Sequence, residues 1–251
     1  MNIGIVVLAT NSYFILGVRF IKKFMYHYKG SATITFYFFS EVDPAPYLPD
    51  NINVEYRYMT NGSWTEGTNS KFKSILSLEH SKSDYLFYFD ADTNVQSEFT
   101  EEWFLGDMVG GQHFGDEGFM KENKAYDRNP NSQAYVPLDT PLTQHYYYGA
   151  FFGGKKDNMI QFCKKLKMYQ ELDQMINYEP AVNDESYINK EFHYNPPTKM
   201  VLCGDFKFAI SDKGGIGDTR DMKLDIEAHK AEILKHKNQL FEIWNNTINV
   251  V

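Results

Sequence analysis

Two aspartates spaced one residue apart, Asp90 and Asp92, follow directly on the aromatic and apolar run Tyr85–Phe89. The run predicts a buried strand, and residues i and i+2 of an extended chain point to the same side. Two carboxylates on one side of a strand end repel each other unless a cation lies near them. The pair therefore favours a site for Mn²⁺, with Mg²⁺ as the alternative, completed by phosphate oxygens. A solvated acidic turn is the other interpretation, because D-x-D alone is a weak pattern.

The elements that would position this pair have the order of a nucleotide-binding α/β fold. Continuous or alternating apolar runs predict four strands, and helical spacing of apolar residues predicts two helices among them. The strands are expected at residues 3–9, 32–40, 52–59 and 85–92, and the helices at residues 13–28 and 70–82. Ligands of an open α/β sheet gather at the carboxyl ends of its strands, which is where the aspartates lie.

Fewer strands are predicted in the second half of the chain. Residues 106–144 are rich in Gly, Asn, Asp and Pro and are expected to form long loops. A long helix is predicted at 155–178, a late strand at 199–204 and a charged helix at 219–248 with an apolar stripe from Leu224 to Trp244. We expect one catalytic domain, residues 1–218, and a C-terminal helical extension, residues 219–251. The stripe would cover the domain or a second subunit of a homo-oligomer.

Composition limits the classes of partner. The 251 residues carry a net charge of −8 and no long Lys/Arg block, which argues against general nucleic-acid binding. Two separated cysteines, Cys163 and Cys203, are expected to be buried thiols in a reducing compartment. No apolar run approaches the length of a membrane-spanning helix, and the N-terminus has no basic region of a signal peptide. A soluble, cytoplasmic protein with no membrane span is therefore expected.

Three further blocks follow the aspartate pair in a specific order. They read SQAYVP at Ser132–Pro137, YYYGAFFGG at Tyr146–Gly154 and NDESYINK at Asn183–Lys190. With FDAD they resemble the family 6 glycosyltransferases, and the resemblance extends over residues 8–199. It implies a GT-A fold, a UDP-sugar donor, a saccharide acceptor and transfer with retention of anomeric configuration, typically forming an α-1,3 bond to a galactose-type acceptor.

The resemblance also implies which residues bind the donor nucleotide. In FDADT, Asp90 and Asp92 would bind Mn²⁺ and the UDP diphosphate, with Ala91 between them. In LATNSY, Tyr13 would stack on uracil. The basic residue that reaches the donor is lysine here and arginine in the vertebrate enzymes. The complete set for this half of the donor is Leu8, Ala9, Thr10, Tyr13, Lys71, Asp90, Ala91 and Asp92.

The block YYYGAFFGG corresponds to the residues that select the donor sugar, here Tyr148, Gly149 and Ala150. In this family a bulky first residue with alanine third excludes an N-acetyl group beside C2. Overpacking a close-packed pocket costs about 1–3 kcal/mol. We therefore expect UDP-galactose first and UDP-glucose second, with UDP-GalNAc or UDP-GlcNAc as the alternative donors.

The catalytic block is NDES. By resemblance, Asp184 would bind donor-sugar hydroxyls, and Glu185 would face the anomeric carbon as nucleophile or charge stabiliser and contact the acceptor. His113 would hydrogen-bond the acceptor sugar. Val182 and Asn183 replace an aromatic residue and a histidine of the vertebrate enzymes, so that the identity of the acceptor stays open.

Alternative interpretations follow from the same residues. Acidic pairs are also common as plain helix starts, since the helix N-terminus favours negative charge. An inactive sugar-nucleotide-binding protein on the same fold is a second hypothesis. A nucleotidyltransferase is a third, although it would need a Gly-rich loop where LATNSY has no glycine.

The candidate basic partners of the diphosphate near the C-terminus are Lys213, Arg220 and Lys223.

Overall fold

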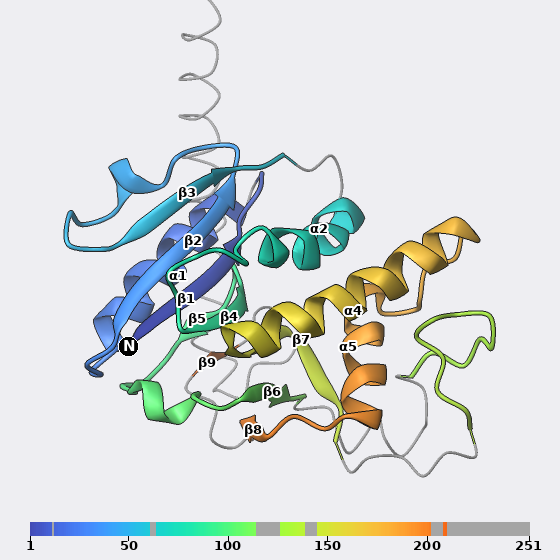
Figure 1. The fold of residues 1–251 in the computed structure, drawn as a ribbon. Helices are drawn as coiled ribbons and strands as arrows, with labels where there is room; N and C mark the ends of the chain where they lie inside the picture. Colours follow the sequence, from blue (N-terminus) through green and yellow to red (C-terminus); the bar gives the residue numbers. More distant parts are fainter. Residues whose placement is uncertain (12, 61–63, 114–125, 139–144, 202–207, 210–251) are drawn as a thin grey trace, which may run out of the picture.

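The computed structural model describes residues 1–11, 13–60, 64–113, 126–138, 145–201 and 208–209 (Figure 1). Several predictions lie outside these residues. They concern the C-terminal helix, the boundary between residues 218 and 219, Cys203 and the three basic candidates Lys213, Arg220 and Lys223. Within the described residues, no helix is long and apolar enough to cross a membrane.

A mixed sheet of seven strands forms the centre of the fold. In spatial order the strands are β3 (Val54–Tyr58), β2 (Thr33–Ser40), β1 (Asn2–Leu8), β4 (Tyr85–Asp90), β7 (Tyr147–Lys155), β6 (Met108–Gln112) and β8 (Lys199–Val201). Strands β3, β2, β1 and β4 are parallel, and β7 runs antiparallel to both β4 and β6. The four strands predicted in the first half are confirmed, and together with the helices they make an α/β fold.

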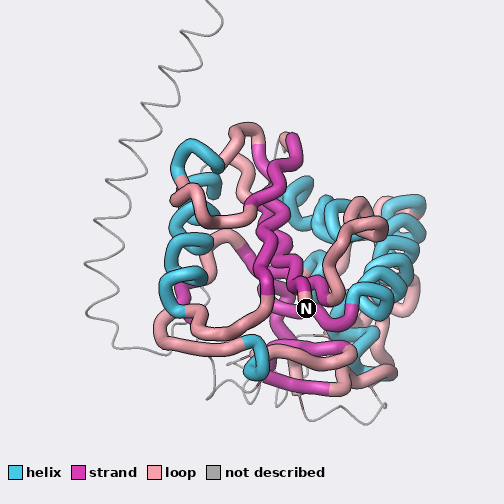
Figure 2. The backbone as a smooth tube through the Cα atoms, turned by 60° about the vertical axis from the view of Figure 1, so that its left-hand side comes forward, coloured by secondary structure: helices cyan, strands magenta, loops and turns pink. Residues whose placement is uncertain are grey.

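Helices cover both faces of this sheet (Figures 1 and 2). Helix α1 (Tyr13–His27) packs on the face to which Ile3, Ile5 and Val7 of β1 point. Val6 points to the opposite face, with the cluster formed by α2 (Trp64–Leu76), α4 (Lys156–Met175) and α5 (Asn183–Tyr194). The smaller elements are η1 (Ala45–Tyr47), η2 (Glu101–Trp103) and a two-stranded sheet of β5 (Asn94–Val95) with β9 (Phe208–Ala209).

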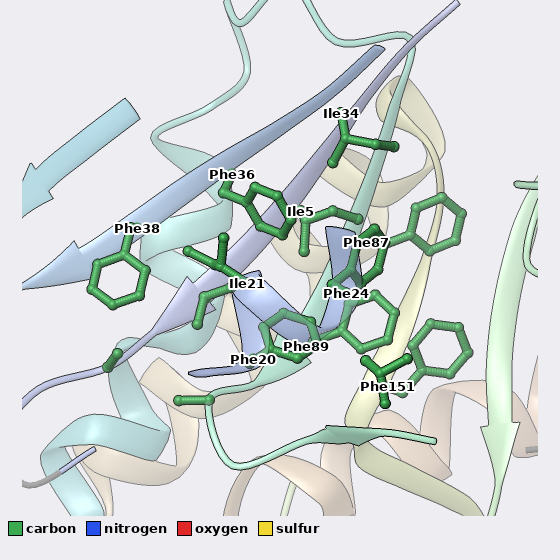
Figure 3. Close-up of a cluster of buried hydrophobic side chains, with 14 of the residues drawn as sticks. Ile5, Phe20, Ile21, Phe24, Ile34, Phe36, Phe38, Phe87, Phe89 and Phe151 are labelled. Atoms are coloured by element: carbon green, nitrogen blue, oxygen red, sulfur yellow. The ribbon is translucent and has the colours of Figure 1, made fainter. Parts of the chain in front are cut away.

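Aromatic rings fill the core under α1 (Figure 3). Phe24 of α1 meets Phe36 of β2 and Phe89 of β4 edge-on, with ring centroids 5.4 Å and 5.9 Å apart. Full burial of such a side chain stabilises the fold by about 1.5–3 kcal/mol. Phe89 is therefore held firmly, and Asp90, the next residue, lies on a rigid base.

Helix α2 differs from its prediction. It was expected at 70–82 and forms at Trp64–Leu76. The segment before Ser70 contains Gly, Thr and Asn, which are poor helix formers, so its helical state depends on tertiary packing. Leu78 is buried in a turn after the helix, which is why the apolar pattern continues beyond the helical residues.

Strand β6 was missed, because residues 106–144 were expected to be loops. Its sequence MVGGQ contains two glycines, which are unfavourable in strands. The glycine at 110 is required by packing, since a Cβ there would lie 2.7 Å from Cδ1 of Tyr147 on β7.

The helix predicted at 155–178 and the strand predicted at 199–204 agree with the structure except at their ends. Helix α4 ends at Met175, short of the expected residue 178, and Asn177 has the left-handed backbone conformation with φ of 54°. Strand β8 begins at Lys199 as predicted and ends at Val201, which is the last described residue of the predicted strand. Cys163 of α4 is a buried free thiol as expected, and burial raises its pKa.

Candidate active site

The aspartate pair lies at the carboxyl end of β4, but its geometry differs from the prediction. The strand ends at Asp90, and the amide of Thr93 donates a hydrogen bond of 3.0 Å to the Asp90 carbonyl. Asp92 therefore belongs to a tight turn and is not the second residue on one side of a strand. Ala91 between them is buried, and the negative charges of both carboxylates still raise the pKa of the same neighbour, the phenol of Tyr88.

Tyr88 is a site residue that the sequence did not reveal. Its hydroxyl donates a hydrogen bond of 2.6 Å to Oδ1 of Asp90. Burial, followed by the charge of Asp90, raises the pKa of Tyr88 well above its usual range. The phenol therefore stays protonated and orients the carboxylate. Its place two residues before Asp90 on the same strand face was the available signal.

Lys71 is the buried cation that links the elements of the site. Its Nζ donates hydrogen bonds to the Gly149 carbonyl at 2.8 Å and to Oδ2 of Asp184 at 2.5 Å. Oδ1 of Asp90 lies 3.8 Å away, and the ring of Tyr88 lies under the ammonium group. Burial alone would lower the pKa of Lys71, but the carboxylates of Asp184 and Asp90 outweigh burial and raise it. One charged lysine thus joins α2, β4, β7 and α5.

Glu185 lies beside the same strand. Its Oε2 accepts a hydrogen bond of 2.7 Å from the backbone amide of Gly149, and the hydroxyl of Tyr146 donates a second hydrogen bond to it. Burial raises the pKa of Glu185 to about 7, the charge of Asp184 adds to the effect, and the two hydrogen bonds oppose it. The carboxyl group therefore titrates near neutral pH.

Asn189 of α5 fixes the helix against β7. Its Oδ1 accepts a hydrogen bond of 2.8 Å from the Tyr147 amide, and its Nδ2 donates one of 2.9 Å to the Tyr147 carbonyl. The same Nδ2 donates to the Glu185 carbonyl at 2.9 Å. Asn189 is 1% exposed, so these bonds are shielded from water. They set the position of Glu185 relative to Gly149.

The residues expected to select the donor sugar lie on β7. Tyr148 and Ala150 are 8% and 6% exposed, and they share one face of the strand. The ring of His113 packs on that of Tyr148 with centroids 4.2 Å apart. The structure therefore brings the expected acceptor contact and the expected donor selector together.

The segment expected to bind uridine begins beside the aspartates. Leu8 is the register partner of Asp90 across β1 and β4. Leu8 and Thr10 are half-buried, Ala9 is fully buried, and Tyr13 at the start of α1 is 40% exposed. The ring of Tyr13 is thus accessible to a flat ligand, whereas Ala9 packs into the core under α1.

The donor atoms at the strand end suit a divalent cation. Asp90 and Asp92 supply carboxylate oxygens, which Mn²⁺ and Mg²⁺ prefer. Among the described residues, no group of three or more His, Cys, Asp or Glu side chains could hold a metal ion by itself. A cation on the two aspartates would therefore keep coordination positions for ligand oxygens, and the residues present fit such an ion.

Two other positions bear on the prediction. Val182, where the vertebrate enzymes have an aromatic residue, is 38% exposed just before α5. It offers a small apolar surface in place of a ring. Trp64, which the family resemblance also matches, begins α2, and its side chain lies outside what the structure describes.

The mixed sheet, the aspartates at its central strand end and the buried carboxylates on α5 define a GT-A-type glycosyltransferase fold. The chain belongs to glycosyltransferase family 6, whose family model matches residues 1–224.

Relatives with known names support this membership. The chain is 27% identical over 209 residues to the histo-blood group ABO system transferase 2 of Rattus norvegicus, covering 80% of this chain and 61% of that protein. It is 27% identical over 211 residues to the globoside alpha-1,3-N-acetylgalactosaminyltransferase 1 of Gallus gallus, covering 80% and 60%. The O-antigen biosynthesis glycosyltransferase WbnI of Escherichia coli is 28% identical over 168 residues, covering 64% and 69%. The matched region spans about three fifths of the length of the two animal proteins.

Proposed function

We propose that the protein is a retaining, Mn²⁺-dependent glycosyltransferase that moves a hexose from a UDP-sugar to a saccharide acceptor and forms an α-1,3 bond. One observation carries the proposal. Lys71 contacts Asp184 and the Gly149 carbonyl directly, and lies 3.8 Å from Asp90. The expected metal carboxylate, sugar-binding carboxylate and donor-selecting strand therefore meet at one buried cation.

The chain's own residues would divide the reaction between them. Asp184, paired with the ammonium group of Lys71, accepts hydrogen bonds from hydroxyls of the donor sugar. Glu185 presents its carboxylate to the anomeric carbon, where it stabilises positive charge or attacks as a nucleophile. A divalent ion bound at Asp90 and Asp92 would offset the charge of the diphosphate leaving group. The partly enclosed site strengthens these interactions, because water screens them less.

The proposed donor has a free hydroxyl at C2, with UDP-galactose preferred to UDP-glucose. Tyr148 is buried, and its contact with His113 opposes a swing that would open the pocket. Ala150 is also buried on the same strand face. An acetamido group would have to displace these packed atoms, at a cost of about 1–3 kcal/mol. The chicken relative is by name an N-acetylgalactosaminyltransferase, so UDP-GalNAc is the donor to test against.

The two alternatives predict different products. An inactive sugar-nucleotide-binding protein would release no product, although Asp90, Asp92 and Glu185 are all present. A nucleotidyltransferase would release pyrophosphate.

The test is a panel of UDP-galactose, UDP-glucose, UDP-GalNAc and UDP-GlcNAc with Mn²⁺ and a set of galactosides as acceptors. Free UDP and pyrophosphate are measured in each reaction, and the anomeric configuration of any product is read by NMR. The proposal expects UDP, an α-linked product and the highest kcat/KM with UDP-galactose. Pyrophosphate, a β-linked product or no UDP with any pair would contradict it.

A further inference from the structure

A polar pocket of about 280 Å³ lies between α2, the end of α4 and the start of α5. Five amide side chains line it, those of Asn69, Gln170, Gln174, Asn177 and Asn183. Two tyrosines, one glutamate and one proline complete the lining, and no lysine or arginine is among these residues. The pocket thus offers hydrogen-bond donors and acceptors without positive charge.

This pocket is separate from the candidate active site, although it shares helices with it. Asn69 lies two residues before Lys71 on α2, and a helix turns by about 100° per residue, so that their side chains leave on different sides. Asn69 Oδ1 accepts a hydrogen bond of 2.7 Å from Nε2 of Gln170 on α4, whereas Lys71 contacts Asp184. Asn69 therefore belongs to the pocket, and Lys71 belongs to the candidate active site.

Several of the amides have unused hydrogen-bonding capacity. Gln170 is 2% exposed, and within the described part of the chain its Oε1 has no hydrogen-bond partner. Nor do the side-chain amides of Gln174, Asn177 and Asn183 hydrogen-bond to any other described residue. Buried polar groups are normally paired, so the unpaired Oε1 of Gln170 indicates a missing partner. Gln174 and Asn177 are exposed, so their amides can bind either water or a ligand.

The chemistry of the lining indicates a neutral, polyhydroxylated ligand. A side-chain amide carries a donor and an acceptor side by side, which match two neighbouring hydroxyls, and a tyrosine ring offers a face to C–H groups. The absence of lysine and arginine from the lining disfavours phosphate, and Glu179 disfavours anions in general. The volume, about 280 Å³, lies just below the usual range of small-ligand pockets, about 300–1,000 Å³, so the ligand must be small, and a single sugar residue meets that limit.

We propose that this pocket is a saccharide subsite that binds one neutral sugar residue of a larger acceptor, away from the reacting sugar. The identification as part of an acceptor rests on the proposed function. Val182, on the expected acceptor side, is exposed and directly precedes Asn183 of the pocket, so the pocket begins one residue from the expected acceptor surface. Binding there would raise acceptor affinity without contributing to the chemical step.

The backbone decides which variants are suitable for the test. Asn177 has φ of 54°, so Asn177→Gly removes its side chain without strain, whereas alanine would be strained there. Gln174 is exposed, and Gln174→Ala removes a second amide at little cost to folding. Gln161→Ala is the matched control, an exposed glutamine on the same helix α4 that does not line the pocket.

The experiment is saturation-transfer NMR with methyl galactoside, methyl glucoside, methyl N-acetylgalactosaminide, methyl fucoside and lactose at millimolar concentration. We expect at least one sugar to bind the wild type and the Asp90→Asn/Asp92→Asn variant alike. Affinity should fall about tenfold in the Gln174→Ala/Asn177→Gly variant, the loss expected for two hydrogen bonds, and stay unchanged in Gln161→Ala.

The outcomes separate this proposal from the proposed function. No binding of any sugar, or binding unaffected by the Gln174→Ala/Asn177→Gly variant, overturns the subsite even if UDP is released in the donor panel. Sugar binding that depends on Gln174 and Asn177, without UDP release in that panel, supports the pocket and contradicts the transferase activity. If both hold, the double variant should raise KM for an extended acceptor and leave kcat unchanged.

Discussion

The backbone amide of Gly149 and the carboxylate of Glu185 lie 2.7 Å apart, and this hydrogen bond joins β7, the strand expected to select the donor, to the helix with the expected catalytic residue. A Cβ at position 149 would lie 3.1 Å from Cβ of Glu185 and 3.2 Å from Oδ2 of Asp184. The close approach of β7 and α5 therefore leaves little room at this position, and a side chain there would move Glu185 or Asp184 by a few tenths of an ångström.

The substitution Gly149→Ala should displace Glu185. A misplacement of about 1 Å can lower a rate about 100-fold, and the shift required here is a few tenths of an ångström. We therefore expect kcat to fall about tenfold, with only a moderate loss of thermal stability. Steady-state kinetics and a melting curve test this together. Wild-type kcat in the alanine variant would show that the contact with Glu185 is not needed for the reaction.

Replacement of Glu185 by glutamine removes the charge and keeps the shape. We expect kcat to fall by at least about 1,000-fold, because a preorganised charge beside the anomeric centre would be lost. UDP affinity, measured by calorimetry, should change little. Near-normal kcat would mean that Glu185 has no catalytic role.

The same variant has a second, pH-dependent effect. The fold raises the pKa of Glu185 to about 7, so the folded protein holds the proton more tightly than the unfolded chain does. The resulting stabilisation is full below the ordinary glutamate pKa of about 4.3 and is lost as pH rises towards 7. Glu185→Gln should therefore match the wild type at pH 4 and exceed it by about 3–4 kcal/mol at pH 8. Parallel denaturant titrations at the two pH values measure this, and a constant difference would contradict the assigned pKa.

Loss of Lys71 should destabilise the fold. Lys71→Met would leave Asp184 buried without its cation, and breaking a buried pair typically costs about 3–5 kcal/mol. The control is Lys164→Met, which removes a lysine from the exposed pair with Glu79 and should leave the melting temperature almost unchanged, because water screens such a pair. Equal melting temperatures for the two variants would show that the Lys71–Asp184 pair adds no net stability.

Metal dependence is tested at the aspartate pair. We expect EDTA to abolish turnover and Mn²⁺ to restore it, since the two carboxylates are the only protein ligands that we assign. The Asp90→Asn/Asp92→Asn variant should lose Mn²⁺ binding, measured by electron paramagnetic resonance, as well as activity. Full activity of that variant in EDTA would refute a metal-dependent reaction.

The sequence predicts much of the sheet, because its parallel strands are apolar runs that few other structures accommodate. It predicts Asp90, since a charged residue after such a run must lie at a strand end. It does not predict the pairing of Lys71 with Asp184, which are 113 residues apart and have no local signal for each other. Strand β6 was missed for a related reason: Gly110 is required by the ring of Tyr147 on the neighbouring strand, and glycine itself does not favour a strand.

The antiparallel course of β7 has a consequence for the evolution of this family. Tyr148 and Ala150 lie on β7, while Asp90 ends β4, Asp92 lies in the turn after it and Glu185 lies in the first turn of α5. Under the proposed function, substitutions at positions 148 and 150 would therefore change which sugar is accepted and leave the proposed metal carboxylates and Glu185 in place. New glycan structures would then arise in a lineage through one or two point mutations on this strand, without passing through an inactive ancestor.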